Sequence, residues 1–279
     1  ACSRHAATRI YQDVVFPMKG RRMTVPRSAC TAALALALIA VPALAQVTFS
    51  TVPDDFVLFV NFDEGSGDTL VDHSSYGHDL ELSSGSADWV TDKDAGGALE
   101  FDGETAFTIE KTDALASFVD TISVGAWVRP SALDGWRNIA EMDGDGNQSW
   151  KVGFNNANPV FTTYHVKDHT AGGAMEVDVW QHIAYVYDGS NANIYIDGAL
   201  DSEIAGSGIL ETVGANTVSL DVGWRSTSQT SFMSGAMDQL WISTEAKSAA
   251  EVEELMGGIT LGVDPVGKTA TTWGLIKRR

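Results

Sequence analysis

The sequence predicts an all-β protein folded as an antiparallel sandwich, and three observations support this fold class. Apolar and polar residues alternate in many short runs with the two-residue period of strands. Gly, Asn and Asp separate these runs, which is typical of tight turns. A single helical pattern stands near the C-terminal end, so strands and helices do not alternate as in a parallel α/β fold.

The N-terminal part predicts an export signal. Basic residues after Met18 precede the apolar run ACTAALALALIAVPALA (29–45), which ends in Ala-Leu-Ala. A basic start, a short apolar middle and a small-residue exit indicate a cleaved signal peptide over residues 18–45. The run is shorter than the ~20 residues that span a bilayer. Residues 1–17 are interpreted as an untranslated or fragment leader, and the mature chain is predicted to be secreted or in the cell envelope, without a membrane span.

Charge and cysteine content restrict the partners of the mature chain. Residues 1–45 hold six of the 18 basic residues and one of the 37 acidic ones, so residues 46–279 carry a net charge of −24. Nucleic acid and anionic membranes are poor partners for such a surface, whereas cations and neutral polymers are suitable ones. Both cysteines, Cys2 and Cys30, lie in the removed part, so the mature chain has no disulfide.

The strands follow in order along the chain. TISVGAWVRP (121–130) places Ile122, Val124, Ala126 and Val128 on one face of a strand that ends at the proline. HIAYVYDGSNANIYIDG (182–198) predicts a hairpin. Further strands are predicted within residues 56–67, 97–110, 149–155, 159–166 and 217–224.

One helix is predicted near the C-terminal end. Ser248 followed by Glu251 fits a capping box, and AAEVEELM (249–256) then runs to Gly257 as a left-handed stop. We therefore predict a domain over 46–257. Residues 258–279 have no clear period and turn basic, and they are predicted to form a tail outside the domain.

The order of five segments resembles the laminin-G-like jelly-roll family of the concanavalin A-like lectin and glucanase superfamily. These segments are LFVNFDEGSGDTLVDHSSYGHD, GGALEFDGETAFTI, TISVGAWVRP, DVWQHIAYVYDGSNANIYIDGAL and LDVGW…FMSGAMDQLWISTEAKSAAEVEELM, and together they cover residues 56–256. The resemblance implies a jelly roll of two antiparallel sheets, often with a calcium ion at the rim. Functions in the family range from sugar binding to adhesion, so the fold does not decide the function.

The acidic stretch NIAEMDGDGNQSW (138–150) has several interpretations. A glucanase strand presents carboxylates on alternate residues, as Glu141, Asp143 and Asp145 do. The last of these would be a glutamate in a retaining enzyme, and glycines interleave with the aspartates here. The stretch also resembles a single degenerate Asp-box turn. The favoured interpretation is a hairpin tip between strands 137–142 and 149–155 with solvated aspartates, and a weak calcium contact is the alternative.

A calcium site is predicted from residues that are distant in sequence. In the resembling family the first strand lies near the last, which brings Asp63 toward Asp238, and Asp72 matches the leading aspartate of a family turn. Ca²⁺ takes six to eight oxygen ligands, which carboxylates and backbone carbonyls supply. The alternative is that Asp72 caps its own turn and that Asp238 accepts hydrogen bonds from backbone amides.

Aromatic residues near strand ends are candidates for a sugar platform. Neutral sugars stack on aromatic faces and bind a few polar groups. Trp136, Tyr164 and Trp224 are the predicted platform residues, and Arg225 adds polar contacts. Packing in the core or at the rim is the alternative for each of these aromatic residues.

The sequence therefore predicts a secreted, non-catalytic module that binds an extracellular glycan or another cell-surface ligand, with a possible structural calcium ion and no catalytic residues. The first alternative is a polysaccharide hydrolase or lyase of the same fold that depends on Glu141. The second is a structural or adhesive envelope protein whose tail, 258–279, is the functional part. The sequence does not indicate the oligomeric state.

Overall fold

A computed structural model describes residues 47–49, 52–94, 96–115, 120–144, 149–164, 167–206 and 217–261. All of these belong to one compact unit, residues 43–279. The predicted leader 1–17 and signal peptide 18–45 lie outside the described residues. Within the described part of the chain, no helix is long and apolar enough to cross a membrane.

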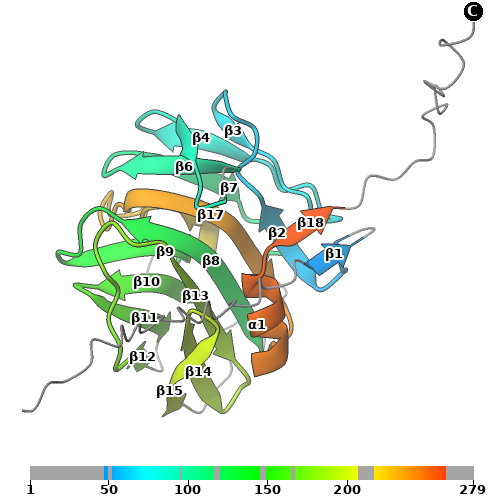
Figure 1. Cartoon of the computed structure of the whole chain (residues 1–279), viewed down its shortest axis with the longest axis vertical. Coiled ribbons are helices and arrows are strands. Elements are labelled where there is room, and N and C mark those ends of the chain that lie inside the picture. Colours follow the sequence, from blue (N-terminus) through cyan, green and yellow to red (C-terminus); the bar gives the residue numbers. More distant parts are fainter. Residues whose placement is uncertain are drawn as a thin grey trace, which may run out of the picture. The chain divides into compact units, whose positions relative to one another are not determined.

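Two large antiparallel sheets form the unit, which confirms the predicted all-β jelly-roll sandwich (Figure 1). Sheet I contains, in spatial order, β12 (Lys167–Thr170), β11 (Asn158–Thr163), β10 (Trp150–Asn155), β9 (Trp136–Gly144), β16 (Thr217–Val222), β7 (Ala106–Glu110), β4 (Leu80–Ser84) and β3 (Thr69–Leu70). Sheet II contains β15 (Ala199–Ala205), β14 (Asn191–Ile196), β13 (Gln181–Tyr187), β8 (Ile122–Pro130), β17 (Ser234–Ser243), β6 (Gly97–Asp102) and β5 (Asp88–Thr91), and β2 (Phe56–Val60) also pairs with β17.

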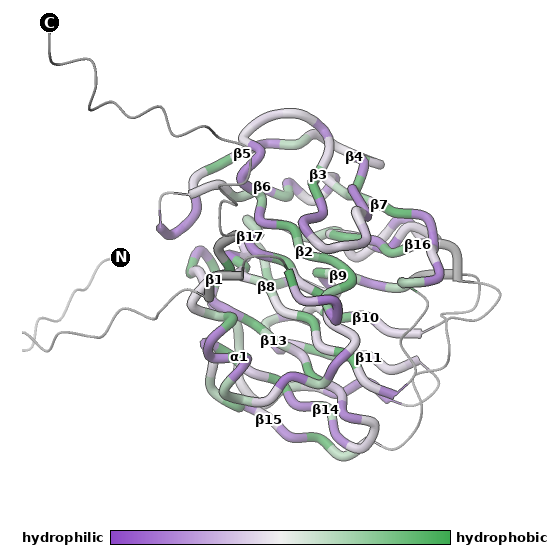
Figure 2. Tube along the Cα trace, turned by 90° about the vertical axis from the view of Figure 1, so that its right-hand side faces the viewer, coloured by the Kyte–Doolittle hydropathy of each residue, from purple (hydrophilic) through white to green (hydrophobic). Residues whose placement is uncertain are grey.

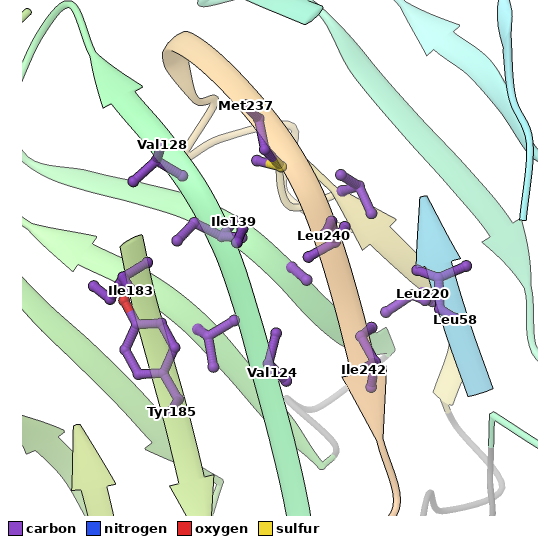
Figure 3. Packing of buried hydrophobic residues seen from close by; sticks show 14 of the residues in the cluster. Leu58, Val124, Val128, Ile139, Ile183, Tyr185, Leu220, Met237, Leu240 and Ile242 are labelled. Atoms are coloured by element: carbon purple, nitrogen blue, oxygen red, sulfur yellow. The ribbon is translucent and has the colours of Figure 1, made fainter. Parts of the chain in front are cut away.

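The main core lies between the two sheets. Hydrophobic and hydrophilic residues are interspersed along the strands, as the colouring of Figure 2 shows. The apolar face predicted for β8, which includes Val124 and Val128, belongs to this core. Side chains of β8, β13 and β17 meet Ile139 of β9 and Leu220 of β16 there (Figure 3). The alternation therefore directs the intervening residues of each strand to the outer face of its sheet.

The outer face of sheet II is covered by α1 (Ala249–Met256). A second apolar cluster joins residues of β2, β13, β14 and β17 to Val252 and Leu255 of the helix. The predicted capping box is confirmed, because the Ser248 hydroxyl accepts a hydrogen bond from the Glu251 backbone N–H and the Glu251 carboxylate accepts one from the Ser248 backbone. The helix therefore begins where local sequence places it and packs through one apolar face.

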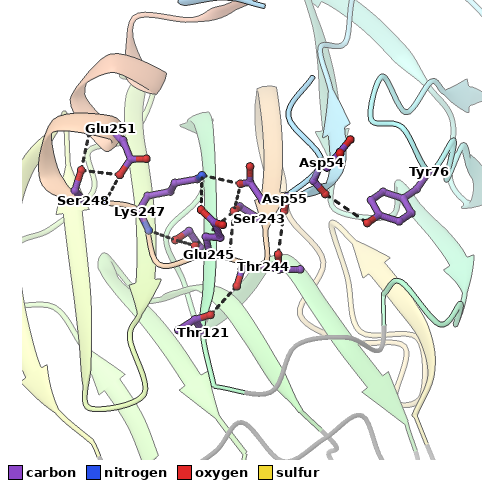
Figure 4. A network of polar contacts seen from close by, with 11 residues as sticks. Asp54, Asp55, Tyr76, Thr121, Ser243, Thr244, Glu245, Lys247, Ser248 and Glu251 are labelled. Carbon is purple, nitrogen blue, oxygen red and sulfur yellow. Dashed lines mark hydrogen bonds and ion pairs between the residues drawn. The ribbon is translucent and has the colours of Figure 1, made fainter. Parts of the chain in front are cut away.

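A buried lysine joins the segment before α1 to the start of β2 (Figure 4). The Lys247 ammonium donates to Asp55 Oδ2 at 2.6 Å and lies 5.1 Å from the centroid of the Phe56 ring. Asp55 Oδ2 also accepts from the Ser243 hydroxyl at 2.6 Å. Because Lys247 is 8% exposed, this pair is shielded from solvent and holds the helix entry against β17 and β2.

The C-terminal boundary differs from the prediction in two respects. Gly257 has φ −63° and is right-handed, while Gly258 has φ +96° and takes the left-handed position that stops the helix. β18 (Ile259–Leu261), which was predicted to belong to the tail, pairs in parallel with β1 (Val47–Phe49). The pairing partner is the first described strand, more than 200 residues away, so no local pattern indicates this extension of the domain.

Candidate functional site

The outer face of sheet I carries a row of polar residues at its centre. Asp221 of β16 pairs directly with Thr108 of β7 and with Glu141 of β9, and Glu141 pairs with Lys151 of β10. Neighbours of these residues in the same strands belong to the core, so the row faces outward. Directly paired side chains have Cβ atoms ~5 Å apart, which places two carboxylates side by side.

Glu141 is the centre of this row and is fully buried. Its Oε1 accepts a hydrogen bond from the Tyr164 hydroxyl at 2.5 Å and lies 3.7 Å from the Arg225 guanidinium. The Asn138 amide donates to Oε2. A buried charge is tolerated only when it is paired and hydrogen-bonded, so these donors stabilise the carboxylate and are in turn held in place by it.

Asp221 fixes the loop that follows β16. Its Oδ2 accepts from the Ser226 backbone N–H at 2.7 Å, and its Oδ1 accepts from the Thr108 hydroxyl at 3.2 Å. The Trp224 indole N–H donates to Thr108 Oγ1 at 3.1 Å. The loop residues after β16 are therefore tied across the outer face of sheet I.

A cation lies against the aromatic residues on the other side of Glu141. The Lys151 ammonium is 3.8 Å from the centroid of the Trp136 ring and 5.8 Å from that of Tyr164. Trp136 is half-buried. A cation over an aromatic face stabilises both side chains and fixes their relative position.

The structure thus brings the four predicted ligand residues, Trp136, Tyr164, Trp224 and Arg225, to one face. It corrects their exposure, because Tyr164 is 9% and Trp224 is 8% exposed, so neither is an open platform as expected. Lys151, Asp221 and Asn138 were not predicted. Their outward position follows from strand alternation, but their proximity to Glu141 depends on the order of strands in the sheet, which the sequence does not show.

A polar cavity of about 410 Å³ holds two of the predicted metal ligands. Asp63 and Asp238 both line it, as expected from the pairing of the first and last strands. Asp92, Lys93 and Asp94 line it too and were not predicted. Burial, together with the nearby Asp92 carboxylate, raises the pKa of Asp238 to about 8, so this carboxyl group is protonated at neutral pH.

The third predicted ligand, Asp72, lies in a different place and caps its own turn. Its carboxylate accepts hydrogen bonds from the backbone N–H groups of Phe59, Ser74 and His78 at 2.7–2.9 Å and from the Ser74 hydroxyl at 2.6 Å. Its side chain is completely shielded from solvent. Four donors occupy the two oxygens, which is the structural role given as the alternative for this residue.

The oxygen atoms around Asp63 are of the type that binds a hard cation such as Ca²⁺, but they already accept hydrogen bonds within the protein. Asp63 Oδ1 accepts from the Gly97 N–H at 3.0 Å, and Asp92 Oδ1 accepts from the Asp94 N–H at 2.8 Å. The Lys93 ammonium pairs with Asp94 in the same cavity. Across the residues whose placement is described, no group of three or more His, Cys, Asp or Glu is arranged to hold a metal ion.

Residues 101–253 match a laminin G family model that represents the concanavalin A-like lectin/glucanases superfamily. This match covers more than half of the chain. A search of curated proteins finds no significant match.

Several solved structures share the fold. Domain 4 of AbnA, an extracellular GH43 arabinanase from Geobacillus stearothermophilus, in complex with arabinotriose, aligns with a TM-score of 0.58 at 15% identity and covers 72% of this chain and 98% of that one. The binding domain of Paraclostridial Mosquitocidal Protein 1 aligns with a TM-score of 0.56 at 17% identity, over 73% of this chain and 52% of that one.

Botulinum neurotoxin type C, whose cell entry depends on interaction with two ganglioside molecules, aligns with a TM-score of 0.52 at 15% identity, over 73% of this chain and 51% of that one. This chain therefore spans about half the length of the two toxin chains it matches. At these identities the likeness establishes the fold alone.

Proposed function

Because the chain belongs to the concanavalin A-like lectin/glucanase superfamily, we propose that it is a secreted, non-catalytic module that binds carbohydrate. The observation that carries this proposal is the convergence of Tyr164, Trp224 and Arg225 on Glu141, with Trp136 nearby, on the face of sheet I that α1 does not cover. Aromatic surface next to fixed hydrogen-bonding groups is the arrangement that recognises sugars.

The environment of Glu141 supports binding rather than hydrolysis. A general acid or a nucleophile must reach the substrate, and two carboxyl groups must flank the scissile bond of a glycoside. Glu141 is fully buried, and both of its oxygens have protein donors. It acts in this proposal as a positioning residue for Tyr164 and Arg225. Asp145, the partner expected in a hydrolase, lies outside the described residues.

Relatives in the fold and the charge of the chain support the choice of ligand. The arabinanase domain was solved in complex with arabinotriose, a neutral oligosaccharide. The strongly acidic mature chain disfavours polyanionic ligands, which leaves neutral glycans as suitable partners. Export to the extracellular space remains part of the proposal and rests on the predicted signal peptide.

A glycan array with the purified chain tests this function, and Trp136→Ala is the informative variant. We expect binding to a neutral glycan that weakens by roughly tenfold or more in Trp136→Ala, because the partly exposed ring supplies stacking surface. Trp180→Ala is the matched control, because Trp180 is also half-buried, has the Arg129 guanidinium 5.5 Å from its ring centroid, and lies immediately before β13 of sheet II.

Equal losses in both tryptophan variants, or no bound glycan at all, would contradict the proposal. Release of reducing ends from a polysaccharide that Glu141→Gln abolishes would instead support the hydrolase.

A structural calcium ion remains a prediction. The oxygen-rich cavity around Asp63 and Asp238 supports it, while Lys93 and the engaged carboxylates in the same cavity weigh against it. The array is therefore run with calcium and with chelator. Binding that is lost with chelator would support the ion, and equal binding in both conditions would remove it from the binding mechanism.

A further inference from the structure

A separate cavity of about 350 Å³ lies on the β4 side of the outer face of sheet I. Its volume falls within the range of small-ligand pockets. The described residues that line it come from β4, from the turn between β6 and β7, and from the loop after β16; they are Ser83, Ser84, Glu104, Trp224, Gln229 and Phe232. Among these six residues, Trp224 also belongs to the binding face around Glu141.

Two aromatic rings form the apolar part of the cavity. The Trp224 and Phe232 ring centroids are 5.5 Å apart, with an interplanar angle of 40°. The Trp224 indole is anchored by Thr108, and the Phe232 carbonyl accepts from Arg137 Nη1 at 3.0 Å. The Trp224 ring and the Phe232 backbone are therefore held before any ligand binds, which lowers the entropic cost of binding.

The loop that carries these rings is held in a strained conformation. Gln229 and Ser231 have φ of +53° and +58°, which non-glycine residues rarely adopt. Arg225 and Thr230 form a β-bridge, and the Asn138 backbone N–H donates to the Ser231 carbonyl at 2.9 Å. Such conformations persist where surrounding contacts fix them, and they often occur where a loop shapes a binding site.

Polar groups at the rim select the class of ligand. Glu104 is the one charged side chain among the six described lining residues, and Gln229 and the two serines supply neutral donors and acceptors. A carboxylate at the rim accepts hydrogen bonds from hydroxyl groups and repels an anionic ligand. Aromatic surface with such a rim suits a neutral polyol better than an acidic sugar.

We propose that this cavity is a subsite for a neutral sugar unit and that it excludes acidic sugars through Glu104. This inference rests on the proposed carbohydrate-binding function and names the subsite and ligand class. Trp224, anchored between the cavity and the Glu141 cluster, links the subsite to the rest of the binding face.

Calorimetry with the full chain tests the subsite, with arabinotriose, cellotriose and maltotriose as neutral probes and trigalacturonic acid as the acidic probe. We expect at least one neutral probe to bind the wild-type chain. Its affinity should fall about tenfold in Gln229→Ala and in Phe232→Leu. Glu104→Gln should increase the affinity for trigalacturonic acid relative to the affinity for the neutral probes, because it removes the negative charge at the rim. Glu203→Ala, an exposed glutamate on β15, is the control and should change neither affinity.

If Gln229→Ala and Phe232→Leu both bind the neutral probes as tightly as wild type, the subsite is overturned. The proposed function would still stand in that case if Trp136→Ala loses glycan binding on the array. Stronger binding of wild type to trigalacturonic acid than to the neutral probes would also overturn the inference. Absence of binding to all three neutral probes would overturn the subsite, and absence of binding to every array glycan would end the proposed function as well. Unchanged melting temperatures would show that the variants are folded.

Discussion

Asp238 shows how burial changes a single side chain. The pKa of this carboxyl group is about 8 in the folded protein, mainly because it is buried and also because Asp92 is close, whereas 3.8 is the ordinary value. The folded state therefore retains the proton to a higher pH than the unfolded state. The stability that this group contributes is present below pH 3.8 and is lost as pH rises through 8.

Asp238→Asn should therefore stabilise the protein at neutral and alkaline pH. Asparagine resembles the protonated carboxyl group and does not ionise, so we expect the stability difference from wild type to grow from pH 4 to pH 8, to a few kcal/mol. Urea unfolding in chelator measures it, with Asp94→Asn, an exposed residue of the same cavity, as the control. A variant less stable than wild type at pH 8 would contradict the assigned protonation.

Calcium would reverse the sign of this effect. If the ion binds at Asp238, wild type gains stability when calcium is added and Asp238→Asn does not, because the variant lacks a charged ligand. The same pair of proteins therefore distinguishes a proton from a metal ion in this cavity.

The proximity of the candidate site residues was partly predictable at this scale. Tyr164, Trp224 and Arg225 stand at strand ends or in loops, where binding residues concentrate, and the structure brings them to one face. Burial of Tyr164 and Trp224 was the alternative given from the sequence, but their contacts were not predictable, since these depend on the hydrogen bonds that Glu141 and Asp221 make with side chains and loop residues from other strands. The sequence shows which residue types stand near strand ends, whereas the order of the strands in the sheet decides which side chains become neighbours.

At the scale of elements, Gly125 of β8 leaves room for the Trp241 ring of the neighbouring strand β17. A Cβ atom at this position would lie 2.2 Å from Cζ2 of Trp241, whose ring is buried across it. We expect Gly125→Ala to destabilise the fold by about 1–3 kcal/mol, because the ring must move within a packed cluster. Gly172→Ala is the control, since its Cβ would meet nothing closer than 3.8 Å. Thermal unfolding of the two variants measures the difference, and equal melting temperatures would contradict the packing argument.

Elements with a strong local signal were predicted well. The predicted helix 249–256 coincides with α1, and the predicted hairpin 182–198 coincides with β13 and β14. The run 97–110 divides into β6 and β7, which belong to different sheets. That division was not predictable, because the turn residues between the two strands do not show which sheet each strand joins.

At the scale of the molecule, the two sheets differ in what covers their outer faces. α1 covers sheet II with apolar contacts, so that face contributes to stability. Sheet I carries the buried Glu141 and Asp221, two carboxyl groups in directly paired positions. Carboxyl groups opposite each other repel when both are ionised, so a purely structural face would not need this pair. The ligand-binding role proposed for sheet I gives a reason for the arrangement.

Two buried histidines make the whole domain sensitive to mild acid. Burial lowers the pKa of His169 to about 4 and that of His182 to about 3, and neither ring nitrogen of His182 has a hydrogen-bond partner. The unfolded chain binds protons near pH 6.5 and the folded chain does not. The stability therefore falls as pH decreases below 6.5, by about 2 kcal/mol per histidine at pH 5.

The loss of stability that the two histidines cause in acid is best measured in an Asp238→Asn background. In wild type, Asp238 makes the free energy of unfolding rise as the pH falls from 8 to 4, which opposes the effect of the histidines. We expect the free energy of unfolding in urea to fall between pH 6.5 and 5, and His182→Leu to remove about half of that fall, since leucine fills the buried site without titrating. Carboxyl groups with lowered pKa values, such as Asp102 and Asp201, act below this window and do not interfere. A pH dependence that His182→Leu leaves unchanged would show that this histidine is not buried in its neutral form.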